Sequence, residues 1–205
     1  MPVITQLTAQ KRGDYVNLYV DDEFVCGLTL TQVAARHLYR GKELSTQDLE
    51  ELQSAAAASK AYVIALRYLG LRIRSVEEMY EYLIRKGFAD YAEPTIARLQ
   101  RENYLNDEDF AQRWWTMRAE QSRSPQAIRA ELIKKGVAKD IIESVVSADN
   151  PQRIIDSIIN LAEKKQRLHS VERQKLMVYL AGKGFRYDDI RLAMESRPDL
   201  FSRLS

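Results

Sequence analysis

The chain contains three copies of a six-residue motif, or phrase, and each copy has lysine at the same position. The copies are Leu83–Phe88, Leu132–Val137 and Leu180–Phe185, and each consists of Leu-x-x-Lys-Gly followed by an apolar residue. The three lysines are nearly evenly spaced along the chain. Ammonium and guanidinium groups bind carboxylates and phosphates, so a row of them could contact an acidic protein surface or the DNA backbone.

Our candidate contacts with a partner are basic residues. They lie near these phrases and near the end of the helix around residue 65. They are Arg67, Arg72, Arg74, Arg85, Lys86, Arg123, Lys134, Lys135, Lys183 and Arg186. A structural explanation competes for the lysines. A cation in the last turn of a helix is favoured by the helix dipole by about 0.3–1 kcal/mol and needs no ligand.

Two adjacent tryptophans lie on one predicted helix and face different directions. Trp114 shares a stripe with Phe110 and Met117, so we expect it in the core. Trp115 falls off that stripe and joins the candidate contacts, because tryptophan is often a hot spot of an interface. The alternative is that Trp115 packs between repeats. The tyrosines could stack on bases, but most lie at the spacing of a helical core.

Catalysis is not indicated by the residue types. Cys26 is the single cysteine, and His37 and His169 have no partner at ligand spacing, so we expect neither a disulfide nor a metal site. The chain has no glycine-lysine loop of the nucleotide hydrolases, and no catalytic triad or carboxylate pair is evident. We therefore expect a protein that is not an enzyme and needs no cofactor.

Composition is that of an ordinary globular protein, with 45% hydrophobic residues and a net charge of +2. Residues 1–58 are acidic on balance and residues 150–205 are basic, which is compatible with a polyanion contact near the C-terminal end. Neither a signal peptide nor a membrane span is evident, and the lone cysteine fits a reducing compartment. We expect a cytoplasmic protein without membrane contact.

The first 58 residues differ from the rest. Two β-prone runs, at 15–20 and 24–26, flank a short acidic turn and predict a hairpin, to which Ile4 and Leu7 could add a third strand. An isolated hairpin is marginal in water, so it should pack on a helix. We expect that helix at 29–40 and a second one at 46–57.

From residue 59 onward the pattern is helical and repetitive. An apolar stripe precedes each Lys-Gly, and a second helix face begins shortly after it. Ser75 with Glu78 has the spacing of a capping box, and Ser124 precedes a proline at a first helical position. Each glycine lies where a helix commonly ends in the left-handed conformation.

These signals predict a mainly α fold built as a tandem array of three three-helix repeats. Such units cannot cover their own apolar faces, so they must stack into an elongated, curved shape. We expect repeats at 59–105, 106–149 and 150–205, the last with a C-terminal tail. The N-terminal extension of a β-hairpin plus helices precedes them at 1–58.

The repeat region resembles the RecX family of recombination regulators. The resemblance depends on phrases in a fixed order: Ala65–Leu69, Arg72-x-Arg74-Ser75-x-x-Glu78, Leu83-x-x-Lys86-Gly87-Phe88, Tyr104–Asp107 with Phe110-Ala111, and Ile128-x-x-Glu131-Leu132-x-x-Lys135-Gly136-Val137. It covers 59–149 closely and 150–195 by the repeat pattern. Ser124 is a departure, because the family usually has a glycine there.

The resemblance implies a regulatory protein that binds RecA filaments on single-stranded DNA and inhibits their ATP hydrolysis and strand exchange. The implied partner is RecA, with at most a weak direct contact to DNA, and a monomer suits a ligand of the filament groove. Two alternatives stay open. A helix-turn-helix DNA-binding regulator could use residues 125–146, although the element occurs three times with no dimerisation segment evident. A general helical scaffold for protein contacts is the other.

Overall fold

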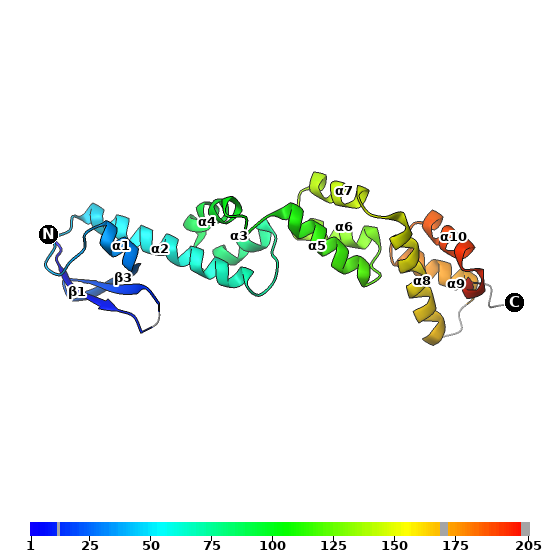
Figure 1. Cartoon of the computed structure of the whole chain (residues 1–205), viewed down its shortest axis with the longest axis horizontal. Coiled ribbons are helices and arrows are strands. Elements are labelled where there is room, and N and C mark those ends of the chain that lie inside the picture. The colour runs from blue at the N-terminus through cyan, green and yellow to red at the C-terminus, as the bar shows by residue number, and fades with distance from the viewer. Residues whose placement is uncertain (12, 169–171, 202–205) are drawn as a thin grey trace. The chain divides into compact units, whose positions relative to one another are not determined.

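The structure is a computed structural model that describes residues 1–11, 13–168 and 172–201 (Figure 1). His169 and the last four residues of the expected tail lie outside the described residues. The chain divides into two compact units. Unit 1 comprises Met1–Arg72 and Tyr80–Arg101, and unit 2 comprises Ile73–Met79 and Glu102–Ser205.

Unit 1 begins with the predicted hairpin and its third strand. Strands β1 (Ile4–Ala9), β2 (Tyr15–Val20) and β3 (Glu23–Thr29) form an antiparallel sheet in the order β1-β2-β3. Asp21 and Asp22 form the turn between β2 and β3 with φ of 48° and 66°. Two left-handed residues in a two-residue turn match the twist of the flanking strands, and aspartate tolerates that conformation better than most residues.

A long helix crosses the boundary that we expected at residues 58 and 59. Helix α1 (Leu30–Ala35) is shorter than predicted, whereas α2 (Thr46–Leu69) continues for 24 residues. No glycine or proline interrupts α2, and its alanine-rich middle favours helix. The first part of α2 packs on β3, where Leu52 and Ala56 join the sheet residues Leu18 and Leu28 in one core.

The second part of α2 forms the first repeat with α3 (Val76–Arg85) and α4 (Ala89–Arg101). Within unit 1, the rings of Tyr68 and Tyr82 stack with centroids 3.8 Å apart, and the Arg98 guanidinium lies 3.7 Å from the Tyr62 ring centroid. These tyrosines therefore pack inside the repeat, as the core spacing predicted.

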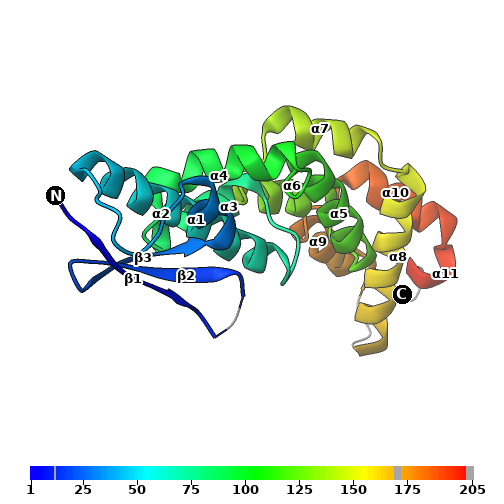
Figure 2. The same cartoon turned by 60° about the vertical axis from the view of Figure 1, so that its left-hand side comes forward.

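Unit 2 contains the other two repeats, which confirms the predicted helical triplets (Figure 2). Their helices are α5 (Asp107–Glu120), α6 (Pro125–Lys134), α7 (Lys139–Ser147), α8 (Pro151–Leu168), α9 (Arg173–Gly182), α10 (Tyr187–Ser196) and the short α11 (Pro198–Phe201). Each repeat has its own core, with Phe110 and Leu132 in the second and Ile158 and Leu180 in the third.

The three Lys-Gly phrases end α3, α6 and α9 in the same way. Gly87, Gly136 and Gly184 have φ of +81°, +76° and +88°, which confirms the predicted left-handed ends. In the first of them, the amide of Phe88 donates to the Leu83 carbonyl at 3.0 Å, and the amide of Gly87 donates to the Ile84 carbonyl at 2.9 Å. We call each of these turns a corner.

Candidate functional site

Two corners of unit 2 each receive a serine hydroxyl from the preceding repeat. Ser75 Oγ donates to the Lys135 carbonyl at 2.7 Å, and Ser124 Oγ donates to the Lys183 carbonyl at 2.6 Å. Each hydroxyl also caps its own helix by accepting from a backbone amide three residues later. Both serines are almost fully buried. A hydroxyl can donate once and accept as well, so one group terminates a helix and joins two repeats.

We call the contact between each of these serines and its corner a joint. The docked helix approaches the corner so closely at both joints that only glycine fits there. A Cβ on Gly136 would lie 2.3 Å from Glu77 Cβ, and one on Gly184 would lie 2.8 Å from Ser124 Oγ. Both glycines also have a positive φ, which any other residue adopts at a cost. The corner glycines of unit 2 are therefore needed for the turn and for the docking of the preceding helix.

Lys135 belongs to a joint and does not extend into solvent. Its Nζ lies 2.6 Å from Glu78 Oε1, and the two side chains are 17% and 15% exposed. The same ammonium lies 4.2 Å from the ring centroid of Trp114. This pairing favours the structural explanation for Lys135, because a carboxylate of the preceding repeat already binds its ammonium group.

Burial counts against Trp115 as a partner contact, since its side chain is only 1% exposed. Helix α5 packs on α8 as well as on α6 and α7, so its inner surface is wider than one stripe. Trp115 lines a small cavity with Ile154 and Ser157 of α8, which fits the alternative of packing between repeats. Trp114, the expected core residue, is only half-buried.

Trp114 belongs instead to a polar cluster on the second repeat. Its indole N–H donates to Glu131 Oε2 at 3.0 Å, and Arg118 binds the same carboxylate at 2.5 and 2.7 Å. Partial burial opposes ionisation, but the hydrogen bonds from Arg118 and Trp114 hold the pKa of Glu131 below its ordinary value. This cluster fixes α5 to α6.

The remaining candidate cations divide between the units. Arg67, Arg85 and Lys86 are exposed in unit 1, and Arg123, Lys134, Lys183 and Arg186 are exposed in unit 2. Arg72 is exposed and Arg74 is half-buried, and both interact with other groups of the protein. Each docking serine directly follows an arginine, Arg74 or Arg123. The joints thus bring basic residues of successive repeats to the same places on unit 2.

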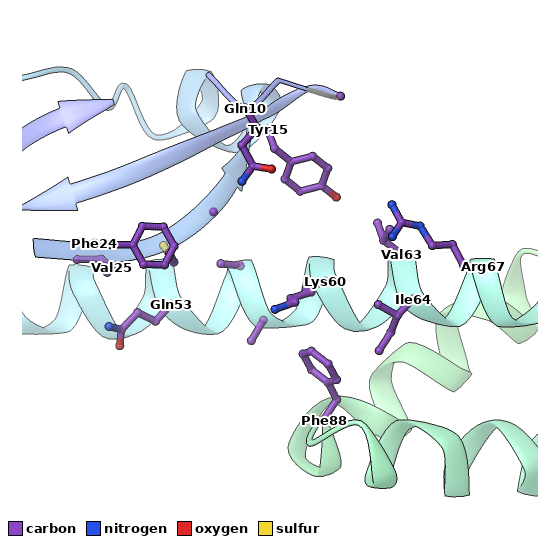
Figure 3. A pocket seen from close by; sticks show the side chains of 15 residues that line it. Gln10, Tyr15, Phe24, Val25, Gln53, Lys60, Val63, Ile64, Arg67 and Phe88 are labelled. Atoms are coloured by element: carbon purple, nitrogen blue, oxygen red, sulfur yellow. The ribbon is translucent and has the colours of Figure 1, made fainter. Parts of the chain in front are cut away.

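A groove in unit 1 was not indicated by the sequence (Figure 3). It has a volume of about 910 Å³ and lies between β3 and α2, with Phe88 on its far side. Phe24, which is 59% exposed, forms part of the wall. Lys60 and Arg67 are the cations among the described residues of its lining, and none of those residues is acidic. No signal in the sequence indicated it, because the helix was predicted to end at residue 57 and α2 continues to Leu69.

The described part of the chain contains no group of three His, Cys, Asp or Glu side chains that could hold a metal ion. Within the same residues, every helix is too short or too polar to cross a membrane. The candidate site is the set of exposed basic side chains on the helical repeats, together with the groove of unit 1.

Comparisons with known proteins identify these repeats. Models of the first, second and third three-helix domains of RecX match residues 61–99, 106–146 and 153–194. The regulatory protein RecX of Lactobacillus gasseri is 31% identical over 204 residues, which are 95% of this chain and 74% of that protein. The regulatory protein RecX of Bacillus licheniformis is 32% identical over 203 residues, with 95% and 77% covered.

Solved structures agree. A crystal structure of regulatory protein RecX superposes with a TM-score of 0.77 at 22% identity, covering 95% of this chain and all of that one. RecX from Lactobacillus salivarius gives a TM-score of 0.63 at 26% identity over 68% of this chain and 96% of that one. Domain models that match more than half of the chain, and relatives at this identity, show that it belongs to the RecX family of regulatory proteins, which are not enzymes.

Proposed function

We propose that this protein binds RecA filaments on single-stranded DNA and inhibits their ATP hydrolysis and strand exchange, and so modulates recombination and DNA repair. Membership of the RecX family supports a regulatory role. The resemblance of the repeat phrases to that family supplies RecA as the target. In this proposal the protein acts by binding, through the exposed basic side chains of its repeats.

The serine joints are the observation that carries the proposal furthest. They set equivalent corners of the second and third repeats in a repeating relation, and the exposed cations Lys134 and Lys183 lie at these corners. Successive repeats of the protein therefore present similar contacts. Such contacts can match successive subunits of a target that also repeats, such as a helical filament. The exposed arginines and lysines would pair with carboxylates of RecA, with at most weak contacts to DNA phosphates.

The same proposal includes a monomer that works in the cytoplasm. Cys26 is a buried free thiol, which is compatible with a reducing compartment. Burial also raises the pKa of this thiol, so it is a poor nucleophile and contributes packing rather than chemistry.

A helix-turn-helix DNA reader is less well supported. Helix α7 stands where a recognition helix would, but its exposed side carries Asp140 and Glu143 beside Lys139. Carboxylates facing a DNA groove would be repelled by phosphates. In addition, the first turn of α6 is already docked on the Lys183 corner.

ATP hydrolysis by RecA on single-stranded DNA tests the proposal. We expect the purified protein to slow hydrolysis at substoichiometric ratios to RecA. The control replaces RecA with another DNA-dependent ATPase on the same DNA, and its rate should not change. An unchanged RecA rate at every ratio would reject the function, and equal slowing of both enzymes would indicate competition for DNA instead.

A further inference from the structure

The corner of the first repeat, residues 84–88, lacks the cover that the other two corners have. A Cβ on Gly87 would meet no described atom within 4 Å, whereas a Cβ on Gly136 or Gly184 would overlap the docked helix. Arg85, Lys86 and Gly87 are all exposed. This corner has the same left-handed glycine and the same hydrogen bonds as the others. It therefore has the docking geometry, and none of the described residues occupies it.

The two occupied corners differ in the number of basic residues, and this difference shows which of them the open corner resembles. Lys134 and Lys135 precede Gly136, and this doubly basic corner receives the first turn of α3, which contains Glu77 and Glu78. The corner at Gly184 has one lysine, because the preceding position is Gly182. It receives the first turn of α6, which has no acidic residue.

The open corner belongs to the doubly basic class, since Arg85 and Lys86 precede Gly87. We propose that it docks the first turn of a helix on the RecA filament, one that begins with Ser or Thr and carries Glu or Asp three residues later. The cap hydroxyl donates to the Lys86 carbonyl as Ser75 does to that of Lys135. The carboxylate pairs with the Lys86 ammonium as Glu78 pairs with Lys135.

The third repeat of another copy of this chain does not fit the same corner. Glu172 is the N-cap residue of α9; it stands where α3 and α6 have serine, and it makes no side-chain cap hydrogen bond. A carboxylate has no hydrogen to donate at neutral pH and would face the Lys86 carbonyl. The first turn of α9 also lacks an acidic residue. The inference rests on the proposed function, because RecA supplies the helix.

Two asparagine variants provide the test. Gly87→Asn adds a side chain at the docking face, and asparagine is among the residues that best tolerate a positive φ. Gly41→Asn is the matched control, because Gly41 also has a positive φ of +92° and no atom within 4 Å of a Cβ. We expect G87N to weaken binding to RecA filaments assembled with ATPγS by about tenfold, and G41N to bind like the wild type. Equal binding by all three proteins would overturn the inference while leaving the function intact.

Zero-length cross-linking of the wild-type complex keeps the inference testable if a variant misfolds. A carbodiimide joins an ammonium to a carboxylate in contact, so the Lys135–Glu78 pair is an internal positive control. We expect Lys86 to couple to an acidic RecA residue located three positions after a Ser or Thr that begins a helix. Coupling to any other carboxylate, including one of this chain, would overturn it. A wild-type protein that does not bind the filament would reject the proposed function first, and the docking site with it.

Discussion

Replacing Ser124 by alanine removes two hydrogen bonds, the cap of α6 and the bond to the Lys183 carbonyl. Ser124→Ala loses the cap of α6, which costs about 1 kcal/mol. It also leaves the Lys183 carbonyl, 2.6 Å away in a partly buried joint, without this donor, at a further cost of about 1–3 kcal/mol. The free energy of unfolding should therefore fall by about 2–4 kcal/mol.

Ser45→Ala is the matched control, because the hydrogen bonds of Ser45 lie within the first turn of α2. It should cost only the cap, about 1 kcal/mol. Urea denaturation followed by circular dichroism gives both values, and amide exchange at Gly184 and Phe185 should accelerate in S124A alone. If S124A were no more destabilising than S45A, the hydrogen bond to Lys183 would not stabilise the joint.

Two further predictions concern unit 2. Trp115→Ala should lower the free energy of unfolding by about 3–5 kcal/mol, whereas Trp114→Ala should cost less because its ring is only half-buried; similar losses in urea denaturation would contradict the burial of Trp115. The lowered pKa of Glu131 adds stability above its ordinary value of 4.5, and that stability is lost as the pH falls through the lower folded-state pKa. Over that acidic range, melting temperatures of the wild type should therefore fall more steeply than those of Glu131→Gln, and parallel curves would contradict this.

Local signals predicted the repeats well. The helix caps at Ser75 and Ser124 and the corner glycines depend on residues only a few positions apart, so their types and spacing were visible in the chain. The hairpin could be predicted for the same reason, because its β-prone runs flank a short acidic turn.

Contacts between repeats could not be predicted from local patterns. Nothing near Ser75 indicates that its hydroxyl reaches a carbonyl 60 residues away. Equivalent positions also acquire different surroundings. Lys135 is paired with Glu78, whereas Lys183 has Ala127 at the corresponding position of the docked helix. No helix in the part of the chain that the structure describes docks at the corner of Lys86.

The burial of the two tryptophans could not be predicted from the helical pattern for a related reason. A single apolar stripe assumes that a helix is covered from one side, but α5 is covered by α8 as well as by its own repeat. The row formed by Ala111, Trp115 and Ala119 is therefore buried, and Trp114 lies at the edge with its indole N–H on Glu131. Which repeats lie beside a helix decides the outcome, and that depends on the tertiary structure.

Binding to RecA filaments by charge-reversed proteins tests the central claim most directly. Lys134→Glu and Lys183→Glu, combined, reverse two exposed cations at the joined corners, and Lys164→Glu reverses an exposed cation of α8 outside the candidate set. We predict that the double variant loses affinity for the filament by at least about tenfold with an unchanged melting temperature, while K164E binds like the wild type. Wild-type affinity in the double variant, or an equal loss in K164E, would contradict the account.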